Sequence, residues 1–216
     1  MLLAFNQGEV CTCPNRAVIQ EDIREEFIAR RIDRARAIKQ GDPRDTATMV
    51  GAQVNRRRHD RIMSCLQIGR DEGAKVLVGG GAASLTGELE HGFHIQPTIL
   101  RGRNRMRVFQ GEIFGPVVSV TILKDEVEAM RIAKDTMYSL GGRGLDARWQ
   151  PRLPLRPCDR GEGVWVNDQH AYPAHAAFGG DKQSGIGPET HEMMLDHYQQ
   201  TQTMLVSYNP NEQGFF

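Results

Sequence analysis

Two cysteines near the start of the chain are the residues best suited to chemistry. Cys11 and Cys13 lie in the stretch FNQGEVCTCPNR, residues 5–16, between an apolar lead-in and an alternating run. A thiol on a turn made by glycine and proline has backbone N–H groups beside it, and that environment favours the nucleophilic thiolate. A buried cysteine is nevertheless more often a small hydrophobe than a nucleophile. The stretch alone leaves both interpretations open.

The composition excludes several classes of function. The 216 residues are 39% hydrophobic, which suffices for one sizeable core. Lys+Arg and Asp+Glu number 27 each, so no electrostatic argument favours nucleic acid or an anionic membrane, and no apolar stretch approaches the length of a membrane span. The four cysteines form neither a disulfide framework nor paired metal spacing, so we expect a cytoplasmic, reduced compartment and no metal site.

The elements that must position these residues alternate between strands and helices, which is typical of an α/β fold with a mostly parallel sheet. The apolar run Val117–Leu123 is predicted to be a central strand. The pattern predicts further strands at 17–20, 75–78, 94–100, 164–167 and 203–208, and helices at 21–40, 55–73, 126–135 and 189–198.

Several segments between these elements carry less decisive signals. Gly79-Gly80-Gly81 is predicted to be a turn, because no phosphate-loop pattern follows it. The basic triplet at 56–58 is interpreted as a solvated helix face. Glu112 and Phe114, beside a Gly-Pro turn, could be a cap and a core plug or the lip of a ligand site. Residues 142–162 have no period and would form a structureless loop of unusual length, and 178–187 form a glycine-rich loop.

Three motifs taken together resemble the aldehyde dehydrogenase superfamily. They are NQGEVC with Arg16, EIFGPV at 112–117, and FGG at 178–180 followed by KQSG at 182–185. They occur in the family's order with family-like spacing, and nearly the whole chain fits around them. Three further sequences resemble bacterial NAD-dependent acetaldehyde dehydrogenases in particular: CTCP, the stretch 170–175 and the terminal GFF.

The resemblance implies a role for five side chains. Cys11 corresponds to the nucleophile, which forms a thiohemiacetal with an aldehyde, passes hydride to NAD or NADP and leaves a thioester for water; its backbone N–H would be half of the oxyanion hole. Glu112 and Phe114 match residues that contact the nicotinamide ribose. Tyr172 and Phe178 match aromatic positions lining the substrate funnel. The neighbouring second cysteine is interpreted as structural.

The resemblance also implies a domain organisation. Residues 1–199 would be a catalytic domain truncated at its start, and 200–216 an oligomerisation strand and tail, with Thr203–Tyr208 extending the sheet of another subunit to make a homo-oligomer. Family members carry a Rossmann-like domain, a glutamate base and an oxyanion-hole asparagine before the nucleophile, none of which is in these residues. We therefore expect little dehydrogenase activity from this chain alone. The alternatives are slow thiol esterase turnover and an inactive remnant that at most associates with other subunits.

Some positions depart from the family pattern. Gly111, Asp181 and Pro188 stand where an acid, an aromatic and an arginine are usual. Residues 141–154 can be back-translated with permissible codons. When these nucleotides are read in a frame shifted by one base, starting within Gly142, they encode AAVWTRDGNRAYR, which resembles the family's sequence at this place. We therefore hypothesise that 142–162 is out of frame, by mutation or sequencing error. Resequencing the locus tests this hypothesis. An intact reading frame whose codons cannot encode the alternative sequence would refute it.

Overall fold

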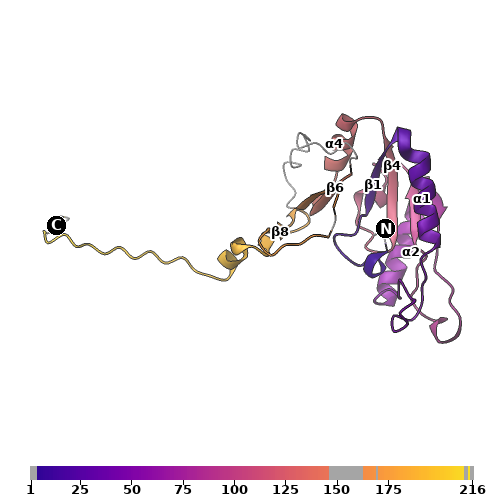
Figure 1. Cartoon of the computed structure of the whole chain (residues 1–216), viewed down its shortest axis with the longest axis horizontal. Coiled ribbons are helices and arrows are strands. Elements are labelled where there is room, and N and C mark those ends of the chain that lie inside the picture. The colour runs from indigo at the N-terminus through magenta and orange to yellow at the C-terminus, as the bar shows by residue number, and fades with distance from the viewer. Residues whose placement is uncertain (1–3, 146–162, 169, 212–213, 215–216) are drawn as a thin grey trace.

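The computed structural model describes residues 4–145, 163–168, 170–211 and 214, and its largest sheet, in the N-terminal part of the chain (Figure 1), has four strands. The strand order is β1 (Arg16–Gln20), β4 (Val117–Leu123), β3 (Thr98–Arg101) and β2 (Lys75–Val78). The first three strands are parallel, and β2 runs antiparallel to β3. The predicted α/β fold with a mainly parallel sheet is confirmed.

Strand β4 lies inside the sheet because its side chains can be buried on both faces. Six of its seven residues are buried, and its polar members are accommodated: Ser119 Oγ donates a hydrogen bond to the backbone oxygen of Val108 at 2.9 Å. Neighbouring residues alternate between two apolar clusters, since Val117 belongs to one and Val118 to the other. This alternation is the period of a strand covered on both faces.

One long helix contributes buried side chains to each of the two apolar clusters. Helix α2 (Arg56–Asp71) starts where the Asn55 side chain accepts a hydrogen bond from the Arg58 N–H, and it buries Ile62 and Leu66 completely. Helix α1 (Arg24–Arg36) buries Ile28 and Ala35 in the other cluster. The short helix α3 (Arg107–Gln110) adds Phe109 to the α2 side, and α4 (Glu126–Lys134) follows β4.

Two predicted boundaries in this half are wrong. The helix expected at 21–40 begins as a 3₁₀ turn, Glu21–Ile23, and α1 ends at Arg36, because the chain beyond it forms a bridge between Gln40 and Val50. The strand expected at 94–100 is regular only over Thr98–Arg101. Ile95 forms an isolated bridge instead, and Pro97 has no N–H to donate to a sheet ladder.

The described residues of the C-terminal half form three small two-stranded sheets. Their pairs are β5 (Tyr138–Ser139) with β9 (Asp181–Lys182), β6 (Gly141–Gly144) with β7 (Gly163–Val166), and β8 (Phe178–Gly179) with β10 (Pro188–Glu189). The predicted structureless loop is therefore wrong at its start, because Gly142–Gly144 pair with β7. Most of the predicted loop, residues 146–162, lies outside the described residues, and so does most of the segment that we hypothesise to be out of frame.

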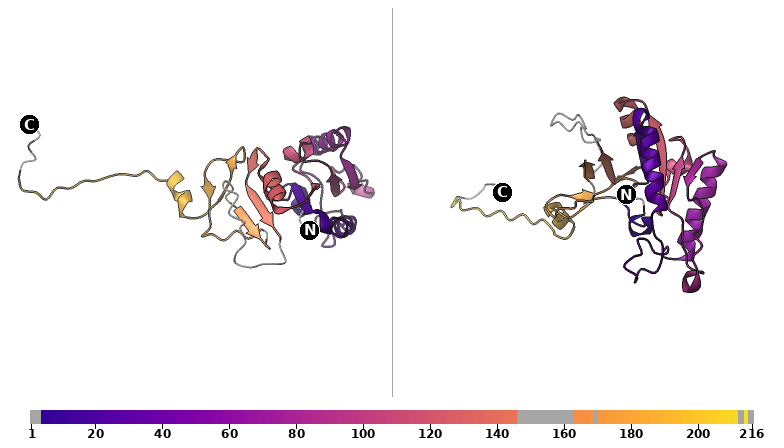
Figure 2. Two further views of the ribbon diagram at one scale, coloured as in Figure 1. Left: turned by 90° about the horizontal axis from the view of Figure 1, so that it is seen from above. Right: turned by 45° about the vertical axis from the view of Figure 1, so that its right-hand side comes forward.

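Two predicted elements near the C-terminus are not present as predicted. The helix expected at 189–198 is replaced by β10 and a 3₁₀ turn, Glu192–His197, because Thr190 and His191 both have a left-handed φ of 59° that an α-helix cannot contain. Residues 201–211 form no strand within the described chain. They run exposed and extended away from the rest of the molecule (Figure 2), so Thr203–Tyr208 has no sheet edge to pair with here.

Two further properties bear on function. No helix in the described part of the chain is both long and apolar enough to cross a membrane, and the cytoplasmic location stays a prediction. Among the same residues, no group of three His, Cys, Asp or Glu side chains is arranged to hold a metal ion.

The chain before β1 packs directly on the chain before β4, and a glycine makes that contact possible. Gly8 is buried with a left-handed φ of 79°, and a Cβ at this position would collide with the backbone carbonyl of Gly115. Parallel strands that pair in register bring their preceding segments to the same edge of the sheet, and β1 and β4 pair with Arg16 opposite Ser119.

We predict that Gly8→Ala lowers the free energy of unfolding by more than Gly73→Ala. Gly73 has a similar φ of 86° but nothing within 4 Å of an added methyl group, so its change costs only the left-handed strain of about 1–2 kcal/mol. Gly8→Ala adds a backbone collision to the same strain. Urea unfolding of both variants measures the difference, and equal losses would contradict a tight contact at Gly115.

Candidate active site

Cys11, the expected nucleophile, lies exposed on the loop that joins a 3₁₀ turn, Phe5–Gly8, to β1. The backbone of this turn is unusual, because Asn6 and Gln7 have φ values of 47° and 46° and precede the left-handed Gly8. Strained backbone of this kind persists where the surrounding structure holds it, and it is common at functional sites. The Glu9 N–H closes the turn on the Asn6 oxygen at 2.9 Å.

Side chains from two directions hold this loop in place. The buried Gln53 donates from Nε2 to the backbone oxygen of Gln7 at 3.2 Å, and Glu9 accepts from the Val54 N–H at 3.3 Å. These contacts tie the loop to the start of α2. On the other side Arg16 is partly buried and donates to the carbonyls of Ile132 and Ala133, at 3.1 and 3.0 Å, at the C-terminal end of α4. A cation there also complements the helix dipole.

The second cysteine of the loop faces inward. The Cys13 N–H donates to the Val10 oxygen at 2.9 Å, and its Sγ lies 3.5 Å from the Phe5 oxygen. Burial, followed by the neighbouring Cys11 charge, raises the pKa of the Cys13 thiol to about 11, against a smaller opposing effect of a hydrogen bond from Val10. Cys13 is therefore a neutral thiol at physiological pH, which supports its structural interpretation.

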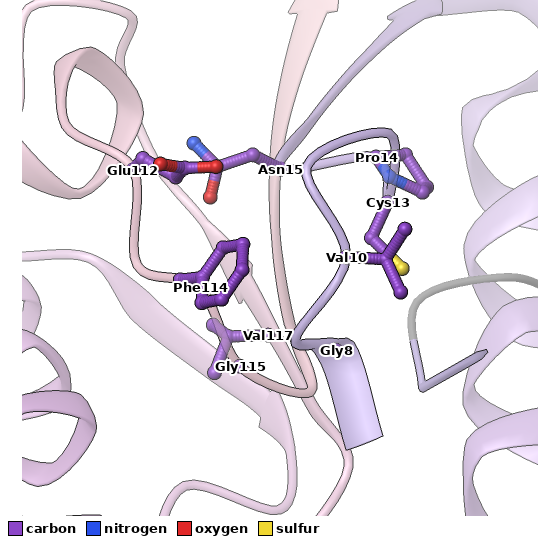
Figure 3. A pocket seen from close by; sticks show the side chains of 9 residues that line it. All are labelled: Gly8, Val10, Cys13, Pro14, Asn15, Glu112, Phe114, Gly115 and Val117. Atoms are coloured by element: carbon purple, nitrogen blue, oxygen red, sulfur yellow. The ribbon is translucent and has the colours of Figure 1, made fainter. Parts of the chain in front are cut away.

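Glu112 and Phe114 lie on the segment between α3 and β4 that packs against the cysteine loop. Asn15 bridges the two segments, since its Nδ2 donates to the Gly111 oxygen at 2.9 Å and its Oδ1 lies 3.5 Å from the Ile113 N–H. Figure 3 shows the Asn15 side chain beside Glu112. Both residues line a shallow hollow of about 230 Å³ including open solvent, and Phe114 and Cys13 also line it. The two predicted cofactor residues thus share one hollow with the cysteine loop.

The same two residues line a wider hollow on the α2 side. Its volume is about 1300 Å³ including open solvent, and its other lining residues are Val54, Asn55, Arg57, Arg58, Arg61 and Tyr138. The guanidinium of Arg58 lies 4.9 Å from the centre of the Phe114 ring. Partial burial raises the pKa of the Glu112 carboxyl, and the positive charges of Arg58 and Arg61 oppose that rise.

The predicted funnel residues Tyr172 and Phe178 contact each other. Their rings are 5.1 Å apart at the centroids and meet edge to face, and Trp165 lies 5.5 Å from Tyr172. The Trp165 indole N–H donates to the Ala171 oxygen at 3.0 Å. Three aromatic rings therefore form one wall, which we call the aromatic wall (Trp165, Tyr172 and Phe178).

His170 connects this wall to the cysteine loop. Its Nδ1 lies 3.4 Å from the Thr12 hydroxyl and 3.3 Å from the Tyr172 hydroxyl, and its ring lies 5.3 Å from that of Phe5. Thr12 is the residue after the expected nucleophile. The His170 side chain therefore links the aromatic wall to the cysteine loop. The described contacts connect the predicted funnel to the Cys11 loop and, separately, the predicted cofactor residues to the same loop.

The sequence alone does not indicate that His170, or the arginines at the start of α2, belong to the site. In the sequence, His170 appears only as part of a family-like stretch, although a histidine two residues before a predicted funnel aromatic is a usable signal. The basic triplet is interpreted as a solvated helix face. Arg56 and Arg57 are indeed exposed, yet Arg57 and Arg58 also line the wider hollow. Nothing in a linear pattern indicates that α2 begins beside Glu112.

We predict that iodoacetamide labels Cys11 and spares Cys13 up to strongly alkaline pH. In the native chain Cys13 labelling should rise only toward pH about 11, whereas in urea it should follow the ordinary thiol value of 9.0. The folded state retains this proton longer than the unfolded chain, so stability should fall as pH rises between these two values. Peptide mass spectrometry measures each site. Native Cys13 labelling with a midpoint near 9.0 would contradict the burial effect.

Comparison with known proteins places this geometry in one family. A model described as the aldehyde dehydrogenase family matches residues 2–204. The chain is 58% identical to an aldehyde dehydrogenase of Paracoccus denitrificans (strain Pd 1222) and 55% identical to acetaldehyde dehydrogenase 2 of Cupriavidus necator, in each case over 100% of this chain and 42% of the relative. It thus spans less than half the length of these relatives.

Solved structures of related proteins superpose on this chain over most of its length. Betaine aldehyde dehydrogenase from Staphylococcus aureus, crystallised in complex with NAD+, superposes with a TM-score of 0.89 at 33% identity, covering 98% of this chain and 42% of that chain. The HpcC protein of Thermus thermophilus superposes with a TM-score of 0.86 at 35% identity, covering 91% of this chain and 40% of that chain. Because the family model matches nearly the full chain, the chain belongs to the aldehyde dehydrogenase family.

Proposed function

We propose that this chain is the catalytic portion of an NAD(P)-dependent aldehyde dehydrogenase that oxidises an aldehyde to a carboxylic acid, with Cys11 as nucleophile. One observation carries the proposal: the exposed Cys11 lies on a loop that contacts the hollow of Glu112 and Phe114 and, through His170, the aromatic wall. Residues 1–199 form the proposed catalytic domain.

The proposed chemistry at Cys11 follows from thiol reactivity. The Sγ thiolate adds to the aldehyde carbon, a C–S bond forms while the carbonyl π bond breaks, and the oxygen takes a proton to give a thiohemiacetal. The Cys11 backbone N–H would stabilise the developing oxyanion. Loss of the C–H hydrogen as hydride to a bound NAD or NADP, and of the O–H hydrogen as a proton, would leave the acyl group on the same sulfur as a thioester. Water then hydrolyses the thioester to the acid and releases the Cys11 thiol. Tyr172 and Phe178 offer an apolar wall for the aldehyde's carbon chain.

The wider hollow fits a nicotinamide cofactor. Glu112 presents carboxylate oxygens that accept hydrogen bonds from ribose hydroxyls, and Phe114 presents a ring already held under Arg58. When bound, NAD or NADP would supply the hydride acceptor for the oxidation. The complex of the S. aureus relative with NAD+ supports NAD at the level of the family, and the choice between NAD and NADP stays part of the proposal.

The test uses aldehyde protection of Cys11. We expect butanal to slow iodoacetamide labelling of Cys11 severalfold, because a thiohemiacetal cannot be alkylated at sulfur, and to leave labelling of the exposed-thiol control, free glutathione, unchanged at the same concentration. Any formation of reduced NAD or NADP, followed by absorbance, should vanish in Cys11→Ser and persist in Cys13→Ser. Cys11 labelling that is indifferent to aldehyde would contradict the proposal.

A second proposed function is association without catalysis, and the C-terminal segment supports it. Residues 201–211 are exposed and include four apolar side chains whose exposed fractions range from 60% to 93%: Met204, Leu205, Val206 and Tyr208. An extended apolar segment with free backbone groups is suited to adding a strand to an open sheet edge. We propose that Thr203–Tyr208 joins this chain to further copies as a homo-oligomer.

We predict that replacing Val206 by proline shifts the chain toward monomer in sedimentation velocity. Proline removes a backbone N–H and cannot take part in a strand ladder. Asn209→Pro, just outside Thr203–Tyr208, is the matched control and should leave the oligomer intact. A wild-type chain that is monomeric at high concentration would contradict this second proposal.

A further inference from the structure

We propose that Gln53 is a positioning residue for Cys11, because it holds the strained turn of the cysteine loop in one conformation. Its side chain is only 3% exposed, and it lies outside the motifs that indicate the family. It acts through the backbone of the loop, since its Nε2 donates to the Gln7 oxygen at 3.2 Å. This inference rests on the proposed function, in which Cys11 is the nucleophile, and adds a residue that controls its reactivity.

The turn before the nucleophile needs partners outside itself to persist. Asn6 and Gln7 have left-handed φ values of 47° and 46°, a conformation that is unfavourable for any residue with a side chain, and Gly8 continues the same hand. Strained backbone of this kind persists only where the surrounding structure holds it. Within the turn, the Glu9 N–H donates to the Asn6 oxygen at 2.9 Å. The bond from Gln53 reaches the middle residue of the left-handed run.

The residue after Gln53 fastens the same turn at a second point. The Val54 N–H donates to Glu9 Oε1 at 3.3 Å, and Glu9 Oε2 accepts from Gln7 Nε2 at 3.0 Å. Two bonds from neighbouring residues fix the orientation of the turn, whereas one bond would allow it to rotate. Gln53 is itself anchored, because its backbone N–H donates to the Phe93 oxygen at 2.8 Å. The turn is thereby held against a fixed part of the fold.

Gln53 holds the loop at a cost to its own solvation. Its Oε1 is buried and has no hydrogen-bond donor among the described residues. An amide oxygen buried without a partner disfavours folding. Methionine is also long and unbranched, and it would remove this oxygen, but it cannot donate to Gln7. The lost hydrogen bond and the removed oxygen act in opposite directions on stability, so Gln53→Met should change stability little while it frees the loop.

The experiment measures the equilibrium between Cys11 and an aldehyde. Butanal isotopically labelled at its carbonyl carbon is titrated into the full chain, and NMR follows the thiohemiacetal carbon, which is assigned by its loss in Cys11→Ser. In Gln53→Met we expect the butanal concentration for half-formation to rise about fivefold, the factor that one neutral hydrogen bond contributes. The urea midpoint should stay unchanged.

Gln40→Met is the matched control. Gln40 donates the same kind of hydrogen bond to a backbone oxygen, that of the buried Ile95 at 2.8 Å, but none to the cysteine loop. Its change leaves a buried carbonyl without its donor. We therefore expect Gln40→Met to lower the urea midpoint and to leave the butanal affinity of Cys11 unchanged.

Gln53→Glu adds a pH signature that a merely structural role would not produce. An ionised carboxylate cannot donate to the Gln7 oxygen, whereas a protonated carboxyl group can donate its O–H. Compared with wild type at each pH, butanal affinity should be low at neutral pH and should recover toward pH about 4.3, the ordinary pKa of glutamate. Burial raises the pKa of this carboxyl group, so the recovery should begin above that pH.

Several outcomes would overturn the inference. They are an unchanged butanal affinity in Gln53→Met, an equal loss of affinity in Gln40→Met, and a deficit in Gln53→Glu that does not recover in acid. Hydrogen exchange separates the inference from the proposed function, because the Glu9 and Cys13 amides should exchange faster in Gln53→Met whether or not Cys11 binds aldehyde. A wild-type chain without a thiohemiacetal would refute the proposed function, and unchanged exchange in Gln53→Met would refute the positioning role.

Discussion

The contact between the backbone of Gly8 and that of Gly115 is the constraint on which the site depends. It brings the cysteine loop against the segment that carries Glu112 and Phe114 at a distance that no side chain on Gly8 would permit. The contact is made possible by the parallel pairing of β1 with β4, which places the segments before both strands at one edge of the sheet. Asn15 then fastens the two segments with side-chain hydrogen bonds.

Charged and polar side chains connect the elements around this edge of the sheet. Arg16 opens β1 and reaches the C-terminal carbonyls of α4, so the first residue of the strand also orients a helix from a distant part of the chain. Glu9 and Gln53 connect the cysteine loop to the start of α2. The arginines of α2 then face Glu112 across the wider hollow. Each link joins residues that are distant in sequence.

Much of the fold was predictable because local patterns and tertiary packing agree there. The run Val117–Leu123 is apolar throughout most of its length, and it forms the interior strand that such a run predicts. Asn55 before an amphipathic run marks the start of α2 as expected. The predictions fail where long-range pairing overrides local preference, as in the bridge between Gln40 and Val50 that follows the end of α1. They fail again at Thr190 and His191, whose left-handed backbone interrupts a helical pattern.

The sequence by itself determined the family resemblance, the identity of the candidate nucleophile and the α/β alternation, because motifs and periodicity are local properties of the chain. Only the tertiary structure decided that His170 links the Cys11 loop to Tyr172, and that Arg58 lies over Phe114. The physical reason is the same in both cases. A contact between segments that are far apart in the chain is set by strand pairing and by the space that glycines leave, and neither can be read from the residues at the contact alone.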